Sequence, residues 1–277
     1  MLPRRRFAAA IAVVTLLLAT GGRPDAAVDE GQIGAQVYEQ LAQKGEIVDS
    51  SPWYAVLNEV GRKISGVANE KYQYPFHFIL VREQQPNAFS VPGGNVYVTL
   101  PLMTFVKNKE ELAGVLCHET SHDIHHDVVH LAQKEQTTGL IATGLAILLG
   151  RNSGLIQNAI GIVAQLQDLH FSRNVEENAD HLGAETCARA GYDPWGMVWL
   201  FQQFEKADTG GSMEMLSDHP TDQHRIAALE QEFRSEPYLF ARYTSSMAYA
   251  HPMPTYSTLA SRYGNEGPFG AARRPGY

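Results

Sequence analysis

Along most of this chain the apolar and polar residues alternate with the period of amphipathic helices. In the segment 29–43, for example, Ile33, Val37 and Leu41 share one helical face. Gly191 and Pro194 mark the end of one later helix and the start of the next. We therefore predict helices over residues 29–43, 53–66, 172–190, 194–207 and 221–234.

Two stretches before residue 100 have the character of strands. "PFHFILV", residues 75–81, predicts one strand, and "NAFSVPGGNVYVTL", residues 87–100, predicts two short strands joined by a Pro-Gly-Gly turn. The expected fold class is therefore α+β and mainly helical, with a small sheet. From residue 236 to 277 the chain is rich in Pro, Gly, Tyr and Ser, and we predict a C-terminal extension that is extended or partly disordered.

Two apolar regions could associate with a membrane or direct export across one. Arg4 to Arg6 precede an apolar run from Phe7 to Ala19, which is short for a membrane span of about 20 residues. Residues 1–27 therefore resemble a secretory signal peptide, and the run from Arg4 to Phe7 also resembles a twin-arginine signal. An uncleaved anchor helix is the alternative. No cysteine lies near the expected cleavage sites, so a lipid anchor is not expected. Residues 139–166 favour buried helices over a hairpin that dips into a membrane surface, and neither half is long enough to span.

Composition and charge narrow the class of protein. The 277 residues are 44% hydrophobic, enough for one sizeable core, and the formal net charge is -8. Beyond the N-terminus we find no cluster of Lys and Arg, so a nucleic-acid partner is not expected. The two cysteines, Cys117 and Cys187, are expected to be buried free thiols, with a single bridge as the alternative.

The stretch "LCHETSHDIHHDVVH", residues 116–130, carries the candidate chemistry. Its helix is expected to begin at Asn108, capped with the help of Glu111. On a helical wheel Glu119 and His122 fall on the face that should be core, where unpaired polar groups are costly. A divalent metal removes that cost, because His118 and His122 lie one turn apart and Glu119 can reach a bound water. A satisfied buried polar cluster is the alternative.

A third ligand must come from another segment. The histidine that metzincins supply downstream is absent, because His125 and Val128 occupy the two diagnostic positions. In the helix 172–190, Glu176 and Asp180 share a face with small residues, so Glu176 could supply a carboxylate and Asp180 could orient a ligand imidazole. An ordinary solvated face is the alternative.

With these residues in view, the chain resembles the HtpX-like zinc metallopeptidases over roughly residues 31–234. The resemblance rests on "NAFSVPGGNVYVTLPLM", "HETSH", "FSRNVEENAD" followed by "LGAETCARAGYDP", and "LSDHPTDQHRI". It implies a zincin-like fold with the small sheet packed on the H-E-x-x-H helix, and one zinc ion per chain. It further implies that His118, His122 and Glu176 are zinc ligands, that Glu119 is the catalytic base and that Asp180 supports a ligand.

The chain departs from the family pattern at two places. Asn178 stands where relatives often have a second glutamate, and His126-Asp127 stands where an Arg-His pair is usual. Both changes are expected to affect local packing or regulation. His126 shares a helical face with His122 but lies about 12 Å along the axis from His118, too far to share an ion with it. His126 is expected to support a ligand or to face solvent. His125 and His130 are assigned to the helix surface.

Three further predictions concern the surroundings of the metal. His219, in "SDHP", is expected to stabilise the oxyanion or to close the open metal position, with a loop anchor as the alternative. Arg225 is expected to hold a nearby carboxylate. Asn95, Val96, Tyr97 and Val98 are predicted to form an edge strand to which an extended peptide substrate adds.

Together these features predict an exported zinc endopeptidase, periplasmic or secreted, with its peptidase domain over residues 28–235. The expected substrates are unfolded or misfolded envelope proteins, with the envelope assembly machinery as a candidate partner. A zinc-stabilised chaperone or assembly factor, whose peptidase activity is latched or minor, is the alternative. Retention of Glu119 favours the enzyme, because a binding module has no chemical use for that carboxylate.

Overall fold

The computed structural model describes residues 29–138, 171–207, 219 and 223–264. Two helices, α1 (Glu30–Gln43) and α2 (Tyr54–Ala68), precede strands β1 (His77–Val81), β2 (Ala88–Val91) and β3 (Asn95–Thr99). The following elements are helical: α3 (Leu100–Phe105), α4 (Lys109–Ile124), α5 (Asp127–Thr138), α8 (Arg173–Ala190), α9 (Trp195–Ala207), α11 (Gln223–Ser235), α12 (Pro237–Phe240), the 3-10 turn η2 (Met247–Tyr249) and α13 (Tyr256–Tyr263). The predicted α+β, mainly helical class is confirmed.

The three strands form one mixed sheet in the order β1-β3-β2. β1 pairs with β3 in parallel, and β2 pairs with β3 antiparallel through the predicted turn. Gly93 and Gly94 in that turn have φ values of 103° and 91°, a left-handed backbone that glycine adopts without strain. β3 is thus the central strand, paired on both sides, and the expectation that residues 95–98 form an edge is wrong. β2 is the outer strand that contacts α4, and it pairs with β3 along one edge only.

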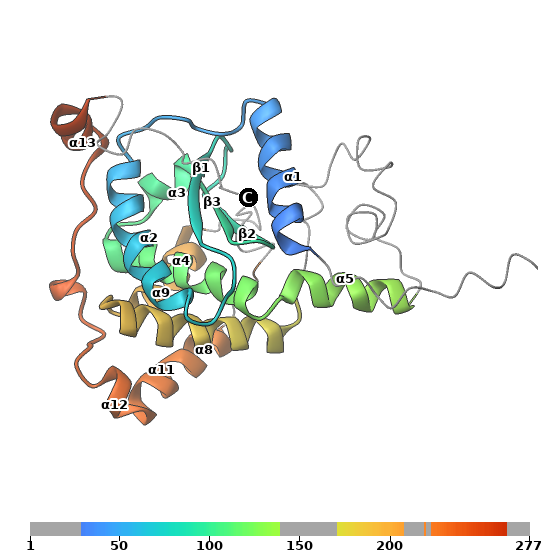
Figure 1. The fold of residues 1–277 in the computed structure, drawn as a ribbon. Helices are drawn as coiled ribbons and strands as arrows, with labels where there is room; N and C mark the ends of the chain where they lie inside the picture. Colours follow the sequence, from blue (N-terminus) through green and yellow to red (C-terminus); the bar gives the residue numbers. More distant parts are fainter. Residues whose placement is uncertain (1–28, 139–170, 208–218, 220–222, 265–277) are drawn as a thin grey trace, which may run out of the picture.

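Helices cover both faces of this sheet (Figure 1). Ile79, Phe89 and Tyr97 point toward α1 and form one core cluster with its apolar face. Leu80 and Val98, on the alternate face, pack in a larger core with α2 and α4. Alternation along the strands therefore fills two separate cores, and α4 lies directly beneath the sheet.

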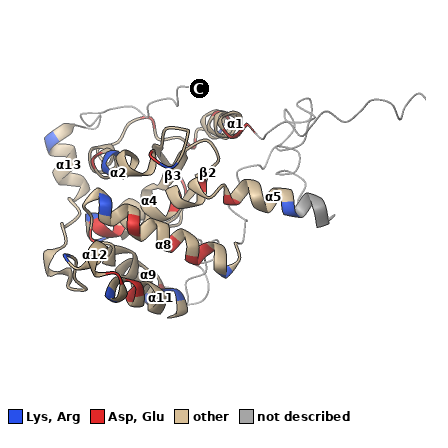
Figure 2. Ribbon diagram, turned by 60° about the horizontal axis from the view of Figure 1, so that its bottom comes forward, with Lys and Arg blue, Asp and Glu red and all other residues tan. Residues whose placement is uncertain are grey.

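The helices α4 and α8 lie side by side, with α9 and α11 on the far side of this pair (Figure 2). Gly183 on α8 permits the close approach, since a Cβ added there would lie 3.2 Å from the His118 amide nitrogen. At the same interface Cys117 and Cys187 are joined by a disulfide, with their Cα atoms 5.8 Å apart. The expectation of two free thiols is therefore wrong. The small residues between the helices bring the two sulfurs within bonding reach.

The segment after α11 wraps back over the molecule, but it is not simply extended. It forms α12, η2 and α13, none of which the sequence pattern predicted. Its backbone pairs with the start of α4, where Lys109 N–H donates to the His251 carbonyl and Met253 N–H donates to the Lys107 carbonyl. Leu259 on α13 is buried in the larger core. This C-terminal segment is therefore part of the packed structure as far as Gly264.

Among the described helices, none combines the length and apolar character that a membrane crossing requires. The predicted signal peptide, residues 1–27, and the apolar stretch 139–166 lie outside the described residues. Both remain predictions.

Candidate metal centre

The site is built on α4, which runs through the centre of the molecule. The Asn108 side chain accepts the Glu111 amide hydrogen at 2.8 Å, and the Glu111 carboxylate accepts the Lys107 amide hydrogen at 2.7 Å. This variant of the predicted capping pattern fixes where the helix begins. Every residue from Glu110 to Asp123 is buried, so the polar groups on the last turns are enclosed in protein.

Four side chains place donor atoms within 4.8 Å of one another: His118, His122, Glu176 and His219. The two Nε2 atoms of His118 and His122 are 3.1 Å apart, and Glu176 carboxylate oxygens lie 3.4 Å and 3.7 Å from them, respectively. Zinc bound tetrahedrally at its usual distances to nitrogen and oxygen separates its ligands by about 3.4 Å. The spacing and the chemistry of these donors therefore fit one small divalent ion.

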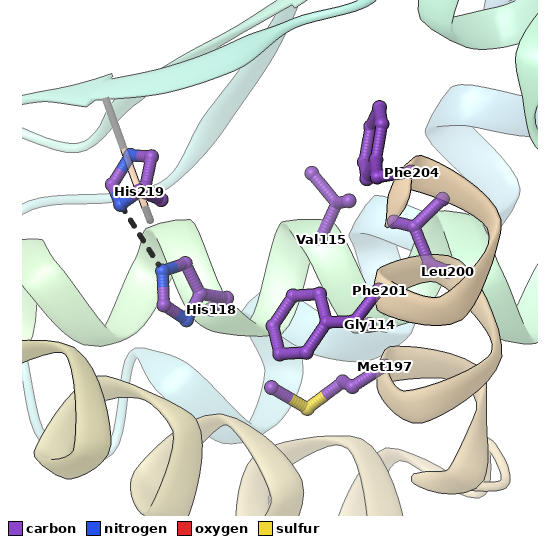
Figure 3. A pocket seen from close by; sticks show the side chains of 8 residues that line it. All are labelled: Gly114, Val115, His118, Met197, Leu200, Phe201, Phe204 and His219. Atoms are coloured by element: carbon purple, nitrogen blue, oxygen red, sulfur yellow. Dashed lines mark hydrogen bonds between the residues drawn. The ribbon is translucent and has the colours of Figure 1, made fainter. Parts of the chain in front are cut away.

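His219 reaches the cluster from the loop before α11. Its Nδ1 lies 2.9 Å from Oε1 of Glu176 and 3.4 Å from Nε2 of His118. The side chain is buried, with 6% of the residue exposed. Figure 3 shows the His219 ring beside that of His118. The structure thus brings His219 into the donor cluster itself, where it can act as a fourth ligand or as a hydrogen-bond donor.

Carboxylates contact the Nδ1 atoms of His118 and His122, on the side of each ring away from the donor cluster. Nδ1 of His118 lies 3.0 Å from Asp180, and Nδ1 of His122 lies 2.8 Å from Asp127. A carboxylate at Nδ1 favours the tautomer that leaves Nε2 free to bind a metal. Phe171 stacks on the His122 ring at 4.6 Å between centroids and restrains its rotation.

Asp127 was not predicted, and the reason is a break in the helix. α4 ends at Ile124, His126 has a φ of 55°, and α5 begins at Asp127. The assumption that the helix continues through His126 is therefore wrong. The turn brings Asp127 back to His122, while Nδ1 of His126 pairs with Glu30 at 2.6 Å. The sequence signal was an acid shortly after the second histidine.

Arg225 on α11 joins the two acids of α8. Its Nε and Nη2 donate to Asp180, both at 2.7 Å, and its Nη1 lies 2.9 Å from Glu176. The guanidinium is 1% exposed and sits 4.8 Å from the centre of the Phe201 ring. Burial alone would raise the pKa of Asp180, but Arg225 and His118 outweigh it and hold that pKa below its usual value. Arg225 thus forms ion pairs with both carboxylates and helps to keep Asp180 ionised.

Burial and charge separate the pKa values of the histidines. Burial lowers the pKa of His118, but Asp180 and Glu176 outweigh it and raise the value to about 10. Burial and the neighbouring His118 lower the pKa of His122 to about 3. For His219, the charges of Glu176 and Glu119 overcome burial and raise the pKa. The carboxylates therefore attract positive charge to this cluster, which also suits a cation.

Glu119 is held differently from the other acids. Its Oε2 accepts the amide hydrogen of Ser90 on β2 at 2.9 Å. Its Oε1 is buried, has no hydrogen-bond partner among the described residues and lies 3.6 Å from Nε2 of His219. One oxygen is thus anchored to the sheet, and the other is available at the edge of the donor cluster.

The remaining candidates lie away from the cluster. Asn95 is buried on the central strand, and its amide donates to the Gly34 carbonyl at 3.1 Å. His125 is half-buried and His130 is exposed. None of these residues contributes to the donor group.

Two histidines one turn apart, an intervening glutamate and a carboxylate from a second helix form the arrangement of a metallopeptidase centre. A family model supports this reading, because the one described as peptidase family M48 matches residues 55–233. The chain belongs to this family of metallopeptidases, as the resemblance to HtpX-like enzymes implied.

Several curated proteins are similar to the chain. A beta-barrel assembly-enhancing protease of Yersinia pestis is 29% identical over 205 residues, which cover 67% of this chain and 42% of the relative. The protein of the same name from Escherichia coli K12 is 26% identical over 216 residues, covering 72% and 42%. A mitochondrial metalloendopeptidase, OMA1 of Schizosaccharomyces pombe, is 30% identical over 173 residues, covering 61% and 48%. The chain thus spans less than half the length of these relatives.

Proposed function

We propose that this chain is a zinc-dependent endopeptidase with His118, His122 and Glu176 as metal ligands and Glu119 as general base. The observation that supports this most directly is the state of Glu119. Its Oε2 is fixed by the Ser90 amide, and its buried Oε1 lies beside the donor cluster without a hydrogen-bond partner among the described residues. That oxygen lies 3.6 Å from Nε2 of His219, a member of the donor cluster, so it is placed to take a proton from a molecule bound there.

The residues of the chain divide the chemistry between them. A bound zinc ion would polarise the scissile carbonyl and acidify the attacking water. Glu119 accepts the proton of that water as it attacks the carbonyl carbon, and then returns the proton to the departing amine nitrogen. Asp180 and Asp127 hold the imidazoles in the tautomer that presents Nε2. Arg225 pairs with Glu176 and helps to keep Asp180 ionised.

The proposed substrates are unfolded or misfolded proteins of the cell envelope, and the proposed location is the periplasm or the exterior. The names of the bacterial relatives, which refer to beta-barrel assembly, support an envelope role. We propose that a peptide adds to the outer edge of β2, and not to β3 as the sequence suggested. β2 is an outer strand of the sheet, and Ser90 links it to Glu119. Backbone pairing of this kind selects extended segments over folded ones.

A second function is a zinc-stabilised chaperone or assembly factor whose peptidase activity is latched. The position of His219 favours this alternative, since its Nδ1 lies among the predicted ligands, where it could occupy the site of the attacking water.

Cleavage of casein separates the two functions. Purified protein with zinc should degrade casein, a chelator should stop the reaction, and readdition of zinc should restore it. Glu119→Gln should keep the metal and the fold but lose turnover by about 10²- to 10⁴-fold, because no other group takes the water's proton. Equal rates for the wild type and Glu119→Gln would contradict the peptidase.

A further inference from the structure

Two acids of α4 contact the hairpin that β2 and β3 form. Glu119 accepts the amide hydrogen of Ser90, within β2, at 2.9 Å. Asp123, one helical turn further along α4, accepts the amide hydrogen of Gly94, in the turn that follows β2. β2 also packs on α4 (Figure 1). The strand is therefore tied to the metal-binding helix at two points, one within the strand and one just beyond its end.

From these contacts we propose that Asp123 is a positioning residue, which fixes the direction of β2 over α4 and so places a bound peptide against Glu119. The inference rests on the proposed function, in which an extended peptide adds to the outer edge of β2. A strand held only at Ser90 could pivot about that contact, whereas a second contact at Gly94 fixes its direction. A peptide paired with β2 follows the strand, so a pivot would carry the scissile carbonyl away from Glu119.

The register of the hairpin makes the Gly94 contact the more durable of the two. Thr99 N–H donates to the Asn87 carbonyl at 3.0 Å, so in the alternating antiparallel pattern the Ser90 amide points to the outer edge of β2. A peptide that pairs there competes with Glu119 for the Ser90 amide hydrogen. Gly94 lies beyond the paired segment, so its bond to Asp123 can persist while the peptide is bound.

The other contacts of the turn lead away from α4. Gly93 N–H donates to the Tyr72 hydroxyl at 2.9 Å, and the Gly94 carbonyl accepts the His77 amide hydrogen at 2.8 Å. Tyr72 and His77 lie between α2 and the end of β1. Of these three contacts, the one with Asp123 is the contact that joins the turn to the metal-binding helix.

Asp123 is costly to bury, which favours a specific role. The residue is 2% exposed, and its Oδ2 has no hydrogen-bond partner among the described residues. A buried carboxylate with an unpaired oxygen lowers stability relative to an apolar side chain of the same shape. The bond to the Gly94 amide is what such an apolar side chain could not provide.

Substitutions at Asp123 test this role. Asp123→Leu keeps the approximate shape but removes the acceptor, Asp123→Ala removes it with less bulk if Leu prevents folding, and Asp123→Asn keeps an oxygen for the Gly94 amide. With a peptide taken from a casein cleavage site, Asp123→Leu should lower kcat by about 10- to 100-fold at nearly unchanged KM, because the peptide still pairs with β2 but is misplaced. Asp123→Asn should restore most of that loss. Both variants should hold zinc like the wild type, since neither removes a donor residue.

Amide hydrogen exchange gives a readout that does not depend on turnover. Asp123→Leu should speed exchange in residues 90–95 by about tenfold, as expected for the loss of one hydrogen bond, and Asp123→Asn should not. Asp193→Ala is the matched control, because it removes a carboxylate that accepts the Trp195 amide hydrogen at 3.0 Å, outside the donor cluster. It should change neither kcat nor exchange in residues 90–95.

The two readouts separate this proposal from the peptidase itself. Faster exchange in Asp123→Leu without any cleavage by the wild type would mean that the contact holds the turn but that the peptidase proposal, and with it the positioning role, fails. An unchanged kcat in Asp123→Leu beside an active wild type would overturn the positioning role and leave the peptidase intact. Loss of zinc from Asp123→Leu, or an equal loss of kcat in Asp123→Asn, would also overturn it, because the effect would not come from the Gly94 bond.

Discussion

Nδ1 of His122 lies 2.8 Å from the Asp127 carboxylate, across the turn that ends α4. This contact orients the ring whose Nε2 faces His118. Burial raises the pKa of Asp127 to about 6, which is still below neutral pH. At pH 7 the carboxylate is therefore mostly ionised and can accept the Nδ1 hydrogen of an imidazole that binds a metal through Nε2.

Replacing Asp127 should therefore weaken metal binding without abolishing it. For Asp127→Ala we expect zinc affinity to fall by about 10- to 100-fold, as is usual when such a supporting carboxylate is lost. Competition with a chromophoric chelator measures this directly. Asp49→Ala, at an exposed aspartate, is the matched control and should bind like the wild type. Unchanged affinity in Asp127→Ala would show that the contact has no role at the metal.

The ligand assignment makes a stronger prediction. Purified protein should hold one zinc per chain by elemental analysis, and His122→Ala or Glu176→Ala should lose it, because each removes one of the three proposed ligands. Glu119→Gln, which alters the same cluster without removing a ligand, should retain it. Full occupancy together with activity in Glu176→Ala would mean that the third ligand is a different residue.

Arg225 is predicted to be important for stability. Arg225→Ala leaves Asp180 and Glu176 buried without their cation and should cost about 3–5 kcal/mol in free energy of unfolding, measured by denaturant titration. Arg234, on the same helix, pairs with Glu230 at a side-chain exposure of 66%, so Arg234→Ala should change that free energy by less than about 1 kcal/mol. Similar values for the two variants would contradict a special role for Arg225.

His219→Ala distinguishes two roles by the sign of its effect. With Nδ1 of His219 among the donor atoms, we expect removal to open a metal position and raise the basal rate of casein cleavage. A rate lowered by about a hundredfold would instead assign His219 to stabilisation of the oxyanion. If both the rate and the zinc affinity stayed the same, His219 would serve only to anchor its loop.

Within single helices the sequence was a good guide. The relation of His118 to His122, and of Glu176 to Asp180, follows from the helical repeat alone. The meeting of the two pairs did not follow from that repeat; it was inferred from the need for a third ligand and from family resemblance. The contact itself depends on Gly183, whose missing side chain lets α8 approach the His118 backbone.

Other features depend on long-range geometry that the residue pattern does not encode. The Pro-Gly-Gly turn identified β2 and β3 as neighbours, but only the parallel pairing with β1 makes β3 central. The helix break at His126 uses a left-handed backbone at a residue other than glycine, so no local signal marks it.

The bridge between Cys117 and Cys187 closes a loop of the chain whose ends are 70 residues apart in sequence. A single backbone cut anywhere within that loop would leave two polypeptides still tied together beside His118. The chain can therefore be nicked there without separation of α4 and α8, the two helices that carry three of the four donor residues. Such a molecule would migrate as one band on a gel without reductant and as two bands with it.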